Sequence, residues 1–181
     1  MKVSTTALPG VLVIEPKVFD DARGSFFESY NLRAFDAAAG SHICFVQDNH
    51  STSARHVVRG LHYQLGRPQG KLVRVVSGEI FDVAVDLRRS SPTFGRWEGF
   101  VLNDENRKQV WLPEGFAHGF LVLSETANVI YKTTDYYVPE CERTIRWDDP
   151  ALGIAWPHSS APILSAKDAS GTSMADAEHF D

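Results

Sequence analysis

The chain has 181 residues, a length typical of one domain. Its hydrophobic fraction of 43% is enough for a sizeable core and excludes a disordered chain. The formal net charge of −5 argues against a general binder of nucleic acid or of a membrane surface, because such partners need a broad basic face. Any anionic ligand must therefore be held by locally placed cations.

Cysteine content and hydropathy exclude further classes. The two cysteines, Cys44 and Cys141, form no close-spaced pair, whereas zinc clusters and disulfide frameworks need more. No long apolar stretch follows a basic start, so we expect no signal peptide, and no run reaches the roughly 20 apolar residues of a membrane span. We predict a soluble, cytoplasmic protein with one domain over residues 1–181, in which the order of the tail at about 171–181 stays open.

The predicted elements are mostly short strands separated by Gly, Pro, Asn and Asp. Runs with a period of two predict strands over 11–14, 25–30, 71–76, 79–87, 94–102, 109–112, 119–123 and 129–134. A helix is predicted over 31–39, with Asn31 as N-cap and Gly40 as the stop, and a short one after Ser165. The turn Ser77-Gly78 predicts a hairpin between two central strands. This spacing favours an all-β sandwich or barrel over βαβ units.

The predicted strand 79–87 has two different faces. Its odd-numbered positions from Phe81 to Leu87 are apolar, whereas Asp82 and Asp86 share the other face with Ile80 and Ala84. Such a strand fits a barrel wall that lines a partly polar cavity. A polar face in plain solvent is an equally common arrangement, and periodicity does not choose between them.

His62 is the first candidate for chemistry. A histidine within a strand changes charge near neutral pH and can act as a base, although an isolated histidine is more often a hydrogen-bonded structural residue. Arg59 nearby, Lys71 at the start of the next strand, and His118 in a predicted rigid turn at 113–119 favour the functional alternative. We expect these residues to converge.

Three further observations concern metal, acid and carboxylate groups. Two scattered histidines, with the amide Gln64 two residues after His62, make a thin ligand shell, so no metal is predicted. The phenol of Tyr131 can donate a proton to a carbon base, but tyrosines in strands usually serve packing. Either Asp82 or Asp168 could orient a histidine, and the residues alone leave this choice open.

Several segments, taken together, resemble the dTDP-4-dehydrorhamnose 3,5-epimerase family. They run in family order over nearly the whole chain, and the ordered set is far more specific than any one motif. The segments are FDDARGSFFE at 19–28, QDN at 47–49, RGLHYQ at 59–64, KLVR at 71–74, GEIFDVAVD at 78–86, SPTFG at 91–95, PEGFAHGF at 113–120, YK at 131–132 and LSAKD at 164–168.

The resemblance implies a mainly β fold, the cupin double-stranded β-helix or jelly roll with a few short helices, and a homodimer. It implies His62 as base, Asp168 as its orienting partner, Tyr131 as proton donor and Lys71 near the sugar's keto oxygen. The implied nucleotide-sugar contacts are Arg23, Glu28, Gln47, Asn49, Arg59, Lys71, His118, Glu142 and Lys167. Phe26 or Phe19 could stack on thymine, and either could equally be a core residue.

The implied activity is that of an isomerase without metal or other cofactor. Its substrate is expected to be dTDP-4-keto-6-deoxy-D-glucose, epimerised at carbons 3 and 5 through an enolate to dTDP-4-keto-L-rhamnose, in dTDP-L-rhamnose biosynthesis. Three alternatives stay open. These are a mono-epimerase, a ketoisomerase acting on a related dTDP-4-keto sugar, and a non-catalytic sugar-binding cupin.

Overall fold

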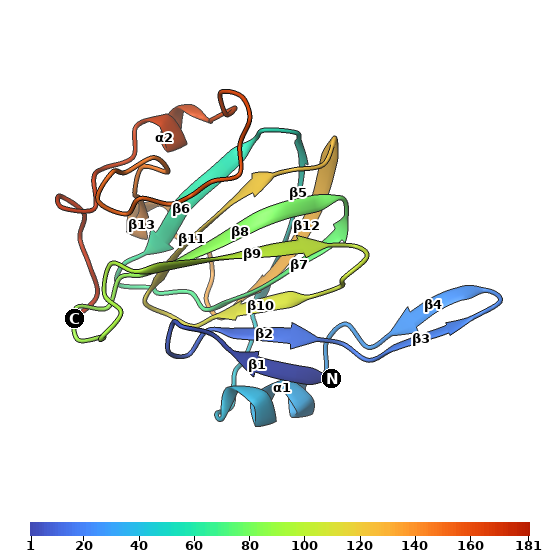
Figure 1. The fold of residues 1–181 in the computed structure, drawn as a ribbon. Coiled ribbons are helices and arrows are strands. Elements are labelled where there is room, and N and C mark those ends of the chain that lie inside the picture. Colours follow the sequence, from blue (N-terminus) through green and yellow to red (C-terminus); the bar gives the residue numbers. More distant parts are fainter.

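The computed structural model describes all 181 residues and consists mainly of strands (Figure 1). The strands are β1 (Lys2–Thr5), β2 (Leu12–Glu15), β3 (Val18–Asp21), β4 (Gly24–Phe27), β5 (Gln47–Ala54), β6 (Val58–Gln64), β7 (Lys71–Ser77), β8 (Glu79–Asp86), β9 (Trp97–Asn103), β10 (Gln109–Leu112), β11 (Phe116–Val122), β12 (Thr126–Thr133) and β13 (Glu142–Thr144). Helices are confined to α1 (Leu32–Ala39), α2 (Ala166–Ala169) and a 3₁₀ turn, Pro139–Cys141.

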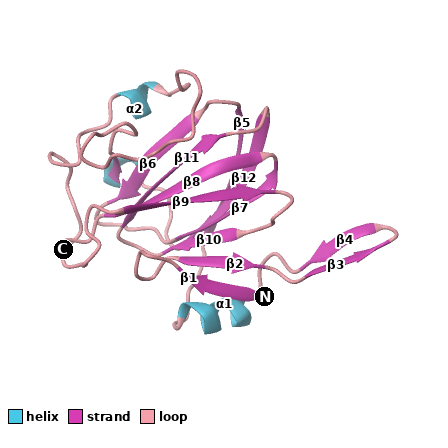
Figure 2. Ribbon diagram, viewed as in Figure 1, coloured by secondary structure: helices cyan, strands magenta, loops and turns pink.

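Two antiparallel sheets form a sandwich (Figures 1 and 2). One has the strand order β1-β2-β10-β7-β12-β5, and the other has the order β13-β6-β11-β8-β9. Strands that follow one another in sequence often lie in different sheets, which is the connectivity of a jelly roll. The predicted cupin fold is confirmed.

The predicted hairpin at Ser77-Gly78 is wrong. β7 pairs with β10 and β12, whereas β8 pairs with β11 and β9, so the chain passes from one sheet to the other at this turn. Gly78 has φ +82°, and a Cβ atom there would lie 2.1 Å from the carbonyl oxygen of Thr126. Glycine is thus required by the tight crossing of the chain between sheets.

The sandwich has two main apolar clusters, and β8 contributes to both. Ile80 and Ala84 belong to the cluster between the sheets, together with residues of β7, β10, β11 and β12. Val83 and Val85 belong to a second cluster on the outer face, which is covered by the C-terminal segment through Trp156 and Met174. The mixed face that contains Asp82 therefore looks into the sandwich, as one of the two sequence alternatives proposed.

The predicted helix is confirmed with both of its ends. The side chain of Asn31 accepts a hydrogen bond from the backbone N–H of Ala34, and Gly40 ends α1 in the left-handed conformation at φ 72°. Phe35 packs against the edge of Trp111, and this small aromatic cluster holds α1 to the first sheet.

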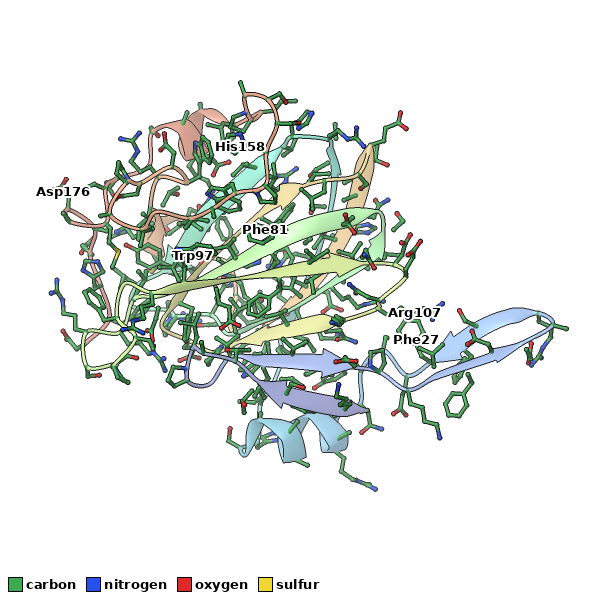
Figure 3. All side chains as sticks on the ribbon, viewed as in Figure 1. Phe27, Phe81, Trp97, Arg107, His158 and Asp176 are labelled. Carbon is green, nitrogen blue, oxygen red and sulfur yellow. The ribbon has the colours of Figure 1, made fainter.

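Two strands leave the sandwich as a separate arm. β3 and β4 pair only with each other and project away from both sheets (Figures 1 and 2). At the arm's base the guanidinium of Arg107 lies 5.8 Å from the ring centre of Phe27 (Figure 3). Further out, Phe19 and Phe26 are 54% and 71% exposed. Large exposed aromatic side chains on an arm are typical of a surface that meets another molecule.

The segment from 145 to 181 lies against the outer face of the second sheet. The phenol of Tyr63 donates a hydrogen bond to the backbone oxygen of Glu178, and the N–H of Phe180 donates to the oxygen of Leu87. The buried carboxylate of Asp149 accepts from the N–H of Met174. These contacts fix the path of the tail, including α2, which carries Asp168. None of the helices is long and apolar enough to span a bilayer.

Candidate active site

A cavity of about 300 Å³ opens between the two sheets, and polar side chains dominate its lining. Strands of both sheets contribute to it, and the mouth is formed by the loop after β12, by β13 and by α2. Its lining residues are Gln47, Asn49, Ser51, Arg59, His62, Gln69, Lys71, His118, Phe120, Tyr131, Tyr137, Glu142 and Lys167.

His62 is held from behind by Asp168. Nε2 of the ring lies 2.5 Å from Oδ1 of the carboxylate, which also accepts from Ser165 Oγ at 2.7 Å through its other oxygen. Burial acts to raise the pKa of Asp168, but the hydrogen bonds from His62 and Ser165 outweigh it and keep the pKa below its ordinary value. Asp168 therefore stays a carboxylate, in a position to orient the imidazole of His62 and to stabilise its protonated form.

Lys71 is buried in the cavity wall formed by the first sheet. Its Nζ donates one long hydrogen bond, 3.4 Å, to the backbone oxygen of His62. Burial lowers the pKa of Lys71 to about 8, while the negative charges of Glu142 and Asp82 act in the opposite direction. A buried ammonium without a close carboxylate is well suited to stabilise a negatively charged oxygen that develops within the cavity.

Tyr131 and His62 come from opposite sheets. Tyr131 is on β12 beside Asn49 of β5, whereas His62 is on β6 and pairs with His118 of β11. Burial raises the pKa of Tyr131, so the phenol keeps its proton at neutral pH. A group that can accept a proton and a group that can donate one therefore reach the same cavity from different walls.

A second histidine–carboxylate pair lies beside the first. His118 is within β11 and not in the turn that the sequence predicted, because β11 begins at Phe116. Its Nε2 is 2.7 Å from Oδ2 of Asp82, and both side chains are buried. The sequence left Asp82 and Asp168 as equal candidates for one histidine, and the structure gives each of them a histidine of its own.

The mouth of the cavity contains a chain of polar contacts. Lys167 Nζ lies 2.8 Å from Glu142 Oε1, and the hydroxyl of Tyr137 donates to Glu142 Oε2 at 2.7 Å. Burial acts to raise the pKa of Glu142, yet the bonds from Lys167 and Tyr137 lower it below its ordinary value. On β5, the amide of Gln47 donates to Asn49 Oδ1 at 2.9 Å. These groups are placed to contact the polar part of a ligand.

The structure brings together ten of the thirteen site residues that the sequence predicted. His62, Lys71 and Tyr131 line the cavity, Asp168 lies behind His62, and the other six are Gln47, Asn49, Arg59, His118, Glu142 and Lys167. Arg23, Phe26 and Glu28 lie outside it. Arg23 is paired with Asp21 at the tip of the arm, while Phe26 and Glu28 border a different cavity of about 380 Å³ at the arm's base.

Four lining residues were missed in the sequence: Ser51, Gln69, Phe120 and Tyr137. Ser51 could have been found, since it follows Gln47 and Asn49 at a spacing of two on β5 and shares their face. Tyr137 follows β12 in an irregular segment, where no periodicity indicates direction. No group of three or more His, Cys, Asp or Glu side chains is arranged to hold a metal ion.

A histidine and a protonated tyrosine on two walls of one cavity fit the chemistry of an isomerase, and the jelly roll is the fold of the cupin class. The family model described as dTDP-4-dehydrorhamnose 3,5-epimerase matches residues 5–176. The chain therefore belongs to this family of isomerases.

Individual relatives agree with this assignment. The dTDP-4-dehydrorhamnose 3,5-epimerase of Pseudomonas aeruginosa is 61% identical over 180 residues, which cover 99% of each chain. The 3,5-epimerase structure from Legionella pneumophila, solved in complex with dTDP-4-keto-L-rhamnose, is 48% identical with a TM-score of 0.95 and covers 98% of this chain and 94% of its own. A 3′-monoepimerase from Streptomyces bikiniensis, solved in complex with dTDP-quinovose, is 35% identical with a TM-score of 0.89, and the match covers 94% of this chain and 86% of its own. The same fold thus occurs in enzymes that invert one or two carbons.

Proposed function

We propose that this chain epimerises dTDP-4-keto-6-deoxy-D-glucose at carbons 3 and 5, which gives dTDP-4-keto-L-rhamnose. The observation that carries this proposal is the position of His62 and Tyr131 in one cavity on opposite sheets, with Lys71 buried beside them. Protons on carbons 3 and 5 are acidic because both carbons flank the keto group. Removal of either proton gives an enolate whose charge lies on the keto oxygen.

Each group has a role in this sequence of steps. His62 accepts the proton, and Asp168 stabilises the imidazolium. General base catalysis contributes only about 10²–10⁴ in rate, so stabilisation of the enolate oxygen must contribute as well, and the ammonium of Lys71 supplies it. Tyr131 then returns a proton from the other wall, and donation to the opposite face inverts the carbon. The oxidation state of the sugar does not change, so the steps need no redox cofactor.

The diphosphate of the substrate needs cations near the cavity, since the chain as a whole is acidic. Arg59 and Lys167 are in the lining, and arginine forms bidentate contacts with phosphate oxygens. Lys167 is already bonded to Glu142, which places its ammonium at the mouth. These positions support a ligand whose sugar is inside the cavity and whose nucleotide is outside it.

We also propose a homodimer in which the arm of one chain reaches the cavity mouth of its partner. Arg23, Phe26 and Glu28 are implied substrate contacts, yet they lie outside the cavity of their own chain. The arm pairs with no other strand, and Phe19 and Phe26 are exposed on it. Docking against a second copy would cover these rings and supply an aromatic surface on which the thymine of the substrate can stack.

An isotope experiment tests the activity. The chain is incubated with dTDP-4-keto-6-deoxy-D-glucose in deuterated water, and the sugar is followed by NMR. We expect deuterium at carbons 3 and 5 together with the inverted product. Label at only one of these carbons would identify a mono-epimerase. Migration of the keto group to another carbon would identify a ketoisomerase, and the absence of any exchange would identify a binding protein.

A further inference from the structure

Asp82 is a buried carboxylate that the proposed reaction does not use. It is in the middle of β8, is fully buried, and faces the space between the sheets. Oδ2 contacts His118 Nε2 at 2.7 Å, whereas Oδ1 is one of only three buried side-chain oxygen or nitrogen atoms of the protein without a hydrogen-bond partner. Burial of a carboxylate is costly unless it is paired and hydrogen-bonded, so this arrangement is a poor way to stabilise the fold.

Asp86, on the same strand and the same face, shows what a structural carboxylate looks like. It forms an ion pair with Arg88 at 2.7 Å and accepts hydrogen bonds from Ser91 and Thr93, each at 2.6 Å. Both carboxylate oxygens of Asp86 therefore accept hydrogen bonds. Asp82 has no arginine or lysine in direct contact, and its one partner is an imidazole that lines the cavity.

The orientation of the His118 ring shows how Asp82 affects its hydrogen bonding. Nε2 faces Asp82, so Nδ1 is the nitrogen that remains for a ligand in the cavity. A neutral ring that gives its hydrogen to the carboxylate would present only a lone pair at Nδ1, which repels an anion. A carboxylate behind the ring stabilises the form with hydrogen on both nitrogens, and that form donates to an anion.

We propose that Asp82 is a positioning residue that makes His118 an anion-binding group: it fixes Nε2–H away from the cavity and stabilises a hydrogen on Nδ1 that points into it. The ligand class is an anionic oxygen of the nucleotide sugar, and in this choice of ligand the inference rests on the proposed function. The two histidine–carboxylate pairs differ in how the carboxylate is shared, since Asp168 also accepts from Ser165 whereas Asp82 has His118 as its only partner. A carboxylate with a single partner stabilises a protonated ring more strongly than one whose charge is shared.

Other titratable and charged groups face the cavity beside His118. Those facing it are Arg59 and His62 of β6, Lys71 of β7, Tyr131 of β12, Glu142 of β13, Lys167, and Asp168 behind His62. Lys71 also responds to the charge of Asp82, which acts against the lowering of the lysine's pKa by burial. Because Asp82→Asn also removes a charge that acts on Lys71, the loss is assigned to His118 by the coupling between the Asp82 and His118 substitutions and not by the Asp82 variant alone.

The test is a double-mutant cycle with dTDP as the probe, which needs no turnover. We expect Asp82→Asn and His118→Gln each to weaken the Kd for dTDP about tenfold, in line with the loss of one charge-assisted hydrogen bond. The double variant should also lose about tenfold and not a hundredfold, since the carboxylate acts through the imidazole. The control Asp86→Asn should lower Tm and leave the Kd for dTDP unchanged.

A second measurement determines by NMR which ring nitrogens of His118 carry hydrogen, in the wild type and in Asp82→Asn. Nitrogen NMR at pH 7 should show hydrogen on Nε2 of His118, and the fraction of rings with hydrogen on both nitrogens should fall in Asp82→Asn. A wild-type ring with a bare Nε2, an additive double variant, or an Asp82→Asn variant that binds dTDP as tightly as wild type would each overturn the inference. If the wild type binds no dTDP, the proposed function fails, while the NMR result still decides the role of Asp82.

Discussion

The cavity between the sheets and the β3–β4 arm both contain residues of the implied ligand site, but only the cavity brings its residues together. His62, Lys71 and Tyr131 come from three strands of two sheets and line one space. Arg23 and Phe26 are close in sequence, yet they lie on an arm that points away from that space (Figure 1). One copy of the chain therefore builds the cavity, and in the dimer proposed above the arm of a second copy would complete recognition of the nucleotide.

The largest expected effect is in the cavity. His62→Ala removes the proposed base, so deuterium exchange into the sugar should fall by about 10³-fold or more, because the other lining histidine, His118, is proposed to hold an anionic oxygen and not to accept the proton. The measurement is the initial rate of label incorporation by NMR. His50→Ala, at an exposed position on β5, is the matched control and should keep the wild-type rate. Near-full exchange by the His62 variant would show that the base is another residue.

Tyr131→Phe should separate the two halves of the reaction. The variant keeps His62 and Lys71, so proton removal continues, while return of a proton to the opposite face loses its donor. We expect product formation to fall about 10²-fold, with deuterium wash-in at the original configuration falling much less. Both rates are read from the same NMR samples. Equal losses in exchange and inversion would mean that Tyr131 is not the donor.

The cavity side of this contrast could largely be predicted from the sequence, because motifs in family order indicated ten residues that the structure brings together, whereas the separate arm was not predicted. The mixed parity of β8 offered two alternatives, a carboxylate wall inside the sandwich or a polar face in solvent, and the structure places Asp82 inside. The family, the jelly roll and the epimerase class are confirmed. Asn31 and Gly40 gave the ends of α1 correctly, since capping depends on neighbouring residues alone.

The errors arise where distant parts of the chain decide the structure. Ser77-Gly78 has the composition of a hairpin turn, but which sheet accepts β8 depends on β9 and β11, which follow later in sequence. The pairing of Asp82 with His118 and of Asp168 with His62 likewise depends on tertiary packing over 36 and 106 residues. The direction of the arm has no local signal at all.

The alkaline side of the pH profile should depend on Lys71. Its pKa is lowered to about 8, so the side chain is an ammonium below this pH and becomes neutral above it. Loss of the charge removes stabilisation of the enolate oxygen, and kcat at pH 9 should be about tenfold below its plateau. Lys71→Arg is the control, because arginine stays charged: its remaining activity should show no decline near pH 8. A wild-type profile that is flat from pH 7 to pH 9.5 would contradict this role.

The smallest expected effect belongs to the arm. Arg23→Ala combined with Phe26→Ala removes one cation and one exposed ring, and we expect KM to rise about tenfold with kcat nearly unchanged, since neither side chain lines the cavity that contains His62. The analogous double change Lys2→Ala with Val3→Ala, on the exposed edge strand β1, should leave KM unchanged. A large loss of kcat would place the arm in the chemistry.

Mixed dimers then show which chain the arm serves. A His62→Ala chain retains its arm, and an Arg23→Ala/Phe26→Ala chain retains its base; co-expression with different tags allows mixed dimers to be purified. If the arm acts on the partner, one site of each mixed dimer combines an intact His62 with an intact arm, so a component with wild-type KM should reappear at about half the wild-type kcat per dimer. If the arm acted on its own chain, no site would contain both, and only the raised KM would be measured.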